Sequence, residues 1–269
     1  MKRTNQRICE DVVIFLAASI QKRHNSAGKI DTMTNFVLVH GTWGGGWQWR
    51  NVAERIRREG HSVFTPTLTG LGEREHLISR QTDLEMHIQD VAAVISCERL
   101  RDVVLVGTSY AGLVISGVAD RIPEQVGALI YLNAAMPTNG KCMLDTVSAE
   151  RRAAVQKLAD VEGEGYRVPT SLVLDTGIED ERIREEYLKR MSPHPLPSLL
   201  QPIRLTGRFM EVARKSYVLA TKKVSHHFQE YHDWAKQQSD WTSHEIASHH
   251  YPMATMPDVT SDLLMRIVM

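Results

Sequence analysis

A single serine stands where a strongly apolar segment stops at a sharp turn. Residues 103–112 run VVLVGTSYAG, which predicts a buried strand, a tight turn with Ser109 at its apex, and then a helix. An elbow of this kind lifts the serine Oγ clear of the sheet. It needs small neighbours such as Gly107 and Ala111, because a bulky side chain would collide with the strained turn. Ser109 is therefore predicted to be a nucleophile that attacks a carbonyl carbon and forms an acyl-enzyme.

A second apolar segment ends in a glycine-rich loop that suits the same chemistry. Residues 36–47 run FVLVHGTWGGGW. The oxyanion that forms during acyl transfer needs two preorganised donors, and the backbone N–H groups of Tyr110 and Thr42 are the natural pair. Gly41 lets this loop pass close to the substrate. Trp43 favours a substrate with an apolar or aromatic group, although a tryptophan here could equally belong to the core.

A general base is expected late in the chain, because sites of this elbow type follow the order serine, acid, histidine. His249 and His250 both follow the last predicted strand. Four more histidines precede them: His226, His227, His232 and His244. Their spacing matches neither a metalloprotease nor a structural zinc site, so we expect them on the surface or in a lid. We expect no metal and no organic cofactor.

Apolar periodicity places both motifs in an alternation of strands and helices. The predicted strands cover residues 36–40, 62–66, 103–108, 128–132, 217–220 and 241–247. The predicted helices include residues 49–56, a segment opened by a capping box at residues 82–85, the elbow helix at 110–122 and a last helix at 259–267. This alternation predicts an α/β fold, with a mostly parallel central sheet and helices on both faces.

Residues 137–212 break this alternation. They are charged, mostly helical and interrupted by prolines, with helices expected from residue 148 and over 178–191. We interpret them as an inserted helical cap over the strand ends, where α/β sheets bind their ligands.

Composition excludes several classes of partner. The 269 residues include 32 basic and 32 acidic side chains, so no global basic field exists to hold nucleic acid or an anionic membrane. Cys9, Cys97 and Cys142 are too scattered to form a disulfide framework, and they indicate a reducing, cytoplasmic compartment.

Residues 1–33 differ in character from the α/β domain expected at 34–269. Their apolar run, residues 11–20, is too short to span a bilayer. Their basic start suits a signal peptide, but acidic residues directly precede the apolar run and no small-x-small cleavage site follows it. We expect a peripheral N-terminal extension, because every strand and site signal comes after it.

These motifs resemble those of the α/β-hydrolase superfamily, and more narrowly those of small bacterial esterases and their plant relatives, the methyl esterases and hydroxynitrile lyases. The resemblance covers residues 34–269. It rests on residues 40–47 (HGTWGGGW), 70–72 (GLG), 107–112 (GTSYAG) and 250–253 (HYPM). It implies the α/β-hydrolase fold. Because the family places its catalytic histidine directly before an x-Pro-Met sequence, the resemblance also selects His250 over His249.

The triad acid is where the sequence departs from the family. Relatives carry the acid after the strand at 128–132 or after the strand at 217–220, and these places hold Asn133 and the lysine pair 222–223. In the serine-protease template, an aspartate-to-asparagine change costs about 10⁴ in turnover. Asn133 could orient His250 or be a vestige, an acid such as Asp145 or Glu230 could reach the site, or the chain could be a weakened or repurposed hydrolase. We prefer Asn133.

Two positions favour an esterase over a lyase. The family's hydroxynitrile lyases carry threonine after the first-strand histidine and lysine after the catalytic histidine, whereas this chain has Gly41 and Tyr251. The resemblance therefore implies a serine esterase, monomeric or homodimeric, that acts on a small carboxylic ester through an acyl-enzyme. The alternative is a non-hydrolytic homologue, either a small-molecule binder or a lyase such as a hydroxynitrile lyase, and the missing acid is its main support.

Overall fold

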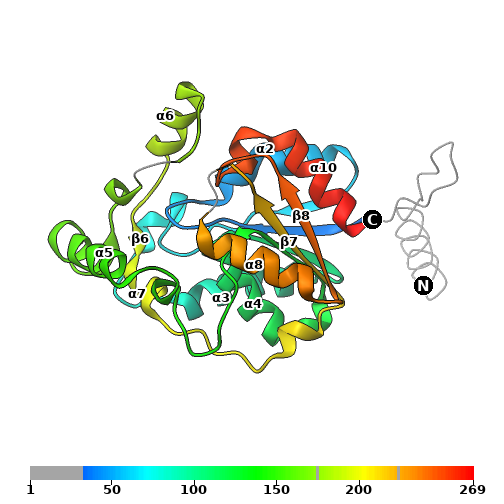
Figure 1. The fold of residues 1–269 in the computed structure, drawn as a ribbon, viewed down its shortest axis with the longest axis horizontal. Helices are drawn as coiled ribbons and strands as arrows, with labels where there is room; N and C mark the ends of the chain where they lie inside the picture. Colours follow the sequence, from blue (N-terminus) through cyan, green and yellow to red (C-terminus); the bar gives the residue numbers. More distant parts are fainter. Residues whose placement is uncertain (1–32, 174–175, 223–224) are drawn as a thin grey trace, which may run out of the picture. The chain divides into compact units, whose positions relative to one another are not determined.

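The computed structural model describes residues 33–173, 176–222 and 225–269. Thr34–Met269 form one compact unit, traced in Figure 1. The extension predicted at residues 1–33 lies outside the described residues, apart from Met33. None of the helices within the described ranges is long and apolar enough to cross a membrane.

A six-stranded sheet forms the centre of this unit. Its strand order is β2-β1-β3-β4-β7-β8, and every neighbouring pair is parallel. The strands are β1 (Asn35–Val39), β2 (Ser62–Phe64), β3 (Val103–Ser109), β4 (Val126–Ala134), β7 (Arg214–Ala220) and β8 (Trp241–Ile246). Each strand predicted from apolar runs is present, which confirms the predicted fold class.

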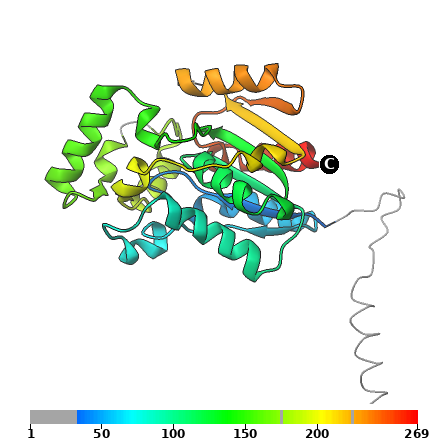
Figure 2. The same ribbon diagram turned by 90° about the horizontal axis from the view of Figure 1, so that it is seen from below.

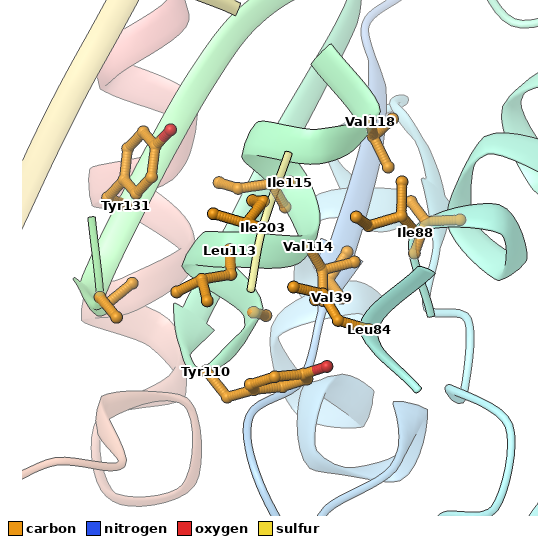
Figure 3. Packing of buried hydrophobic residues seen from close by; sticks show 14 of the residues in the cluster. Val39, Leu84, Ile88, Tyr110, Leu113, Val114, Ile115, Val118, Tyr131 and Ile203 are labelled. Atoms are coloured by element: carbon orange, nitrogen blue, oxygen red, sulfur yellow. The ribbon is translucent and has the colours of Figure 1, made fainter. Parts of the chain in front are cut away.

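Helices cover both faces of the sheet (Figures 1 and 2). One face carries α2 (Arg50–Arg58) and α10 (Pro257–Val268), and the other carries α3 (Leu84–Cys97), α4 (Ala111–Arg121) and α8 (His226–Gln237). Successive side chains of a strand point to opposite faces of the sheet. Phe36 and Leu38 therefore pack in a first core, on the α2 and α10 face, and Val37 packs in a second core, on the α3, α4 and α8 face. Figure 3 shows the second core, where α4 side chains such as Val114 pack beside Val39.

The start of α3 differs by one residue from the predicted capping box. Asp83 is the N-cap, and its side chain accepts a hydrogen bond from the Met86 N–H at 2.9 Å. Thr82 is fully buried, and its Oγ1 instead accepts the Ser79 N–H at 3.0 Å. Aspartate caps as well as threonine does, and the preceding turn already engages the threonine.

Three α-helices and a small sheet lie within the described residues predicted to form the cap. They are the helices α5 (Ala149–Glu162), α6 (Glu181–Lys189) and α7 (Leu196–Leu200), together with an antiparallel pair of two-residue strands, β5 (Arg167–Val168) and β6 (His194–Pro195). Figures 1 and 2 show these helices grouped to one side of the sheet. The helix predicted at 178–191 is shorter than expected.

The helix α8 was not predicted from the sequence, and one histidine on this helix contradicts the expected surface position. His232 is fully buried, between α8 and the last two strands, whereas His226 is exposed. Burial lowers the pKa of His232 and keeps the ring neutral. The face of α8 that carries His232 packs against the sheet, and the polar sequence of this short helix does not indicate which face is buried.

Candidate active site

The elbow has the geometry that the glycine pattern predicts. β3 ends at Ser109, which adopts a left-handed backbone conformation with φ 54°, and α4 begins at Ala111. A Cβ at Gly107 would lie 2.8 Å from the Ala111 carbonyl oxygen, and one at Gly112 would lie 1.9 Å from the Ala135 carbonyl oxygen. Only glycine fits at these positions, so strand, turn and helix can pack closely around the serine.

Ser109 lines a cavity with a volume of about 320 Å³, together with Thr42, Trp43 and His250. Four sequence-predicted site residues that are far apart in the chain therefore meet in one hollow. The segment predicted to be a cap supplies most of the apolar wall: Met143, Leu144, Val147, Val155, Leu172 and Leu199. Arg151 of α5 is the one charged side chain among the described lining residues.

Gly41 and Thr42, the loop residues predicted to serve the oxyanion hole, lie beside Ser109. A Cβ at Gly41 would lie 2.9 Å from the Ser109 Cβ, so a side chain at this position would collide with the Ser109 side chain. The N–H of Thr42 donates to no other group in the part of the chain that the structure describes. Tyr110 directly follows Ser109 at the start of α4, where backbone N–H groups lack helical partners.

Asn133 contacts the imidazole of His250 directly. Its Nδ2 lies 2.8 Å from His250 Nδ1, and its Oδ1 accepts the Ala220 backbone N–H at 3.2 Å. The backbone donor fixes the amide orientation, because a flipped amide would set its NH₂ group against the Ala220 N–H. Asn133 therefore donates to Nδ1, and the neutral imidazole carries its own proton on Nε2.

This tautomer is opposite to the one that a general base needs. Proton abstraction from a serine requires a free lone pair on Nε2, and the acid of a triad secures it by accepting an Nδ1–H. Burial also lowers the pKa of His250 to about 4, so the ring is neutral at pH 7. The site brings Ser109, His250 and Asn133 together, while the Asn133 hydrogen bond disfavours the imidazolium.

The other candidates for the acid and the base bond elsewhere. Asp145 accepts the Cys142 N–H at 2.8 Å and pairs with Arg152, and Glu230 lies 3.3 Å from His226. His249 Nε2 lies 3.4 Å from Glu179 of the cap and lines a different pocket. Neither acid has a hydrogen bond to His250 among the described contacts.

A buried group of neutral histidines, which was not predicted from the sequence, lies beside the elbow. His40, His87 and His194 are all fully buried. Burial lowers the pKa of His40 and of His87 to about 4, and it also lowers that of His194. The position of His87, one residue before Ile88 on the apolar face of α3, could have revealed it; nothing in the sequence marks His194. No cluster of three or more possible metal ligands occurs within the described ranges.

Comparison with known proteins supports the fold and the reaction class. The model of the alpha/beta hydrolase family matches residues 36–263. A carbendazim hydrolyzing esterase from Nocardioides sp. (strain SG-4G) is 35% identical over 240 residues, which cover 86% of this chain and 98% of that protein. Esterase PIR7B of Oryza sativa subsp. japonica is 26% identical, over 87% of this chain and 95% of the relative.

Among solved structures, an extracellular alpha/beta-hydrolase from a Paenibacillus species superposes with a TM-score of 0.75 at 24% identity. The match covers 87% of this chain and 98% of the other chain. The family match over most of the chain, together with the elbow around Ser109, shows that this protein belongs to the alpha/beta hydrolase family.

Proposed function

We propose that this carboxylic ester hydrolase works through an acyl-enzyme on Ser109, with His250 as general base and the N–H groups of Thr42 and Tyr110 as the oxyanion hole. One observation carries the proposal. Ser109 sits on a strained elbow and shares an apolar cavity with His250 and the Thr42 loop. Esterase activity in relatives that align over most of the chain supports the same reaction class.

The reaction has two halves. Ser109 Oγ attacks the ester carbonyl while its proton passes to His250 Nε2, and the oxyanion hole stabilises the tetrahedral intermediate. The C–O bond to the alcohol then breaks, and the alcohol leaves with the proton from Nε2. Water repeats the sequence on the acyl-enzyme and releases the acid.

The Asn133 hydrogen bond slows the transfer of the Ser109 proton to His250. The productive imidazole must carry its proton on Nδ1, where it meets the Asn133 NH₂ group instead of a carboxylate. The active tautomer is therefore a minor form. The enzyme remains a serine esterase, and its turnover is lower than a complete triad would give.

The cavity favours a small ester with an apolar or aromatic group. Its volume of about 320 Å³ and its aliphatic walls suit such a substrate, and Trp43 provides an aromatic surface. We propose a cytoplasmic enzyme, monomeric or homodimeric, without metal or organic cofactor and with no nucleic acid or membrane partner.

A second function has one specific observation in its favour. An imidazole protonated on Nε2 can donate to a substrate oxygen, as a binder or a lyase would need. Gly41 and Tyr251 speak against hydroxynitrile lyase chemistry, because they replace the threonine and lysine of the family's lyases. Turnover of any ester by pure protein would exclude a pure binder.

The test is a panel of esters, lactones and amides with wild-type protein and Ser109→Ala. The substitution is small, so folding should stay near normal, and ester turnover should disappear almost entirely. Wild-type turnover by a folded Ser109→Ala protein would refute the acyl-enzyme mechanism.

A further inference from the structure

The cap holds every polar group of Trp43. The Trp43 N–H donates to His194 Nδ1 at 3.3 Å, and its indole N–H donates to the Val168 carbonyl oxygen at 3.0 Å. Its own carbonyl oxygen accepts the Ser192 N–H at 3.1 Å. Trp43 has a positive φ of 57°, which costs energy in a residue with a large side chain and persists only when its surroundings enforce it. The cap supplies that enforcement.

His194 is built to accept the Trp43 N–H. It is fully buried in β6, where it pairs with Val168 of β5. Its Nε2 lies 2.9 Å from Ser198 Oγ, which itself donates to the Pro195 carbonyl oxygen at 2.8 Å. Since the Ser198 proton is already committed, His194 donates through Nε2 and leaves Nδ1 free as an acceptor. Burial lowers the pKa of His194 and preserves this neutral form.

The same ring contacts the other side of the candidate oxyanion hole. The Tyr110 ring meets His194 edge-on, with ring centroids 5.0 Å apart. The Tyr110 hydroxyl lies 2.9 Å from His87 Nδ1, and His87 Nε2 lies 2.9 Å from the Thr69 carbonyl oxygen. His194 thus touches Tyr110, which carries one oxyanion donor, and Trp43, the residue that follows the other donor.

We propose that His194 is a positioning residue for the oxyanion hole: the β5–β6 ribbon of the cap fixes the Thr42 N–H through Trp43. This inference rests on the proposed acyl-enzyme mechanism. His194 has no contact with the substrate cavity among the described lining residues, so it acts through Trp43 and Tyr110. Loss of His194 Nδ1 as an acceptor leaves the Trp43 N–H unpaired and lets the strained loop relax, and this relaxation moves the Thr42 peptide.

The experiment compares His194→Leu with His194→Asn, because asparagine can place its Oδ1 where Nδ1 stands. His232→Leu is the matched control. His232 is also a fully buried histidine, and neither of its ring nitrogens has a hydrogen-bond partner in the described structure. Turnover of p-nitrophenyl butyrate gives kcat and KM, and inhibition by butylboronic acid, which forms a tetrahedral adduct on serine, reports on the oxyanion hole.

Removing one oxyanion donor costs about 10²–10³ in kcat, and misplacing one costs less, so we expect kcat of His194→Leu to fall about 10- to 100-fold. KM should change less than about threefold, because uniform substrate binding is untouched. The affinity of His194→Leu for the boronate should fall together with kcat. His194→Asn should recover most of the lost kcat and most of the lost boronate affinity. His232→Leu should change the stability of the protein but not kcat.

Wild-type kcat in folded His194→Leu would overturn the inference, and so would a loss confined to KM. If His194→Leu does not fold, Ser198→Ala tests the same point, since it removes the acceptor that fixes the His194 tautomer; unchanged kcat and boronate affinity there would also overturn it. Ser109→Ala separates the two levels. Activity in that variant refutes the mechanism together with the inference, whereas its inactivity beside unaffected His194 variants refutes the inference alone.

Discussion

Replacing Asn133 by aspartate is expected to raise turnover. A carboxylate at this position would accept the Ala220 N–H that Asn133 Oδ1 accepts at 3.2 Å, and it would face His250 Nδ1, which now lies 2.8 Å from the amide nitrogen. The imidazole would then carry its proton on Nδ1 and expose the Nε2 lone pair to Ser109. The imidazolium formed during attack would meet a negative charge in place of an amide donor.

The size of the gain in kcat depends on two opposing effects, the stabilisation of the imidazolium and the desolvation of a buried carboxylate. The template cost of about 10⁴ sets the upper limit of the gain, equivalent to about 5 kcal/mol. Asn133 is only 4% exposed, so an ionised carboxylate there loses several kcal/mol of solvation. Two hydrogen bonds to the charged group return about 1.5–3 kcal/mol each. We expect kcat to rise about 10²-fold and the free energy of unfolding to fall by about 1–3 kcal/mol.

The pH profile provides an independent readout. In the wild-type protein burial lowers the pKa of His250 to about 4, which sets the acidic limb of kcat/KM near that value. An adjacent carboxylate favours the charged imidazolium and raises this pKa, so the acidic limb of Asn133→Asp should move toward neutral pH.

Stopped-flow or steady-state hydrolysis of p-nitrophenyl butyrate from pH 4 to 9 measures both effects. Asp145→Asn and Glu230→Gln serve as controls and should retain wild-type activity, because these carboxylates pair with Arg152 and His226. A folded Asn133→Asp protein with unchanged turnover and an unchanged acidic limb would show that the Asn133 amide does not limit proton transfer to His250. Loss of activity in either control would show that the acid comes from elsewhere.

Two further outcomes are expected. Burial lowers the pKa values of His40 and His87 from 6.5 to about 4, so their contribution to stability is complete above pH 6.5 and is lost as the pH falls toward 4. The free energy of unfolding in urea should therefore be lower at pH 5 than at pH 7, by about 2 kcal/mol for each of the two histidines. Equal free energies of unfolding at both pH values would contradict this assignment. A protein that starts at Met33 should fold and keep its ester turnover, because every described strand follows that residue; a large drop in melting temperature would show that residues 1–32 stabilise the domain.

Local sequence patterns predicted the sheet and the elbow because these features depend on short-range chemistry. The apolar run before Ser109 and the glycines around it specify a strand and a strained turn without further context. Asn133 lies at the carboxyl end of β4, and His250 comes after the carboxyl end of β8. Parallel strands bring their carboxyl ends to one edge, so the approach of these two residues was also predictable.

The cap and α8 were less predictable because their packing is not local. His232 was expected on the surface, yet α8 turns it into the core. Nothing near His194 in the sequence shows that it bonds to Trp43. The orientation of the Asn133 amide depends on the Ala220 N–H, a contact between two strands that no motif encodes.

The proposed mechanism depends on Ser109 as the nucleophile of an esterase. A serine-reactive phosphonate, followed by intact-mass measurement and peptide mapping, tests it most directly. We expect one adduct per chain, located on Ser109, with ester turnover lost in proportion to labelling. No adduct in a folded protein, or an adduct on another residue with Ser109 unmodified, would contradict it.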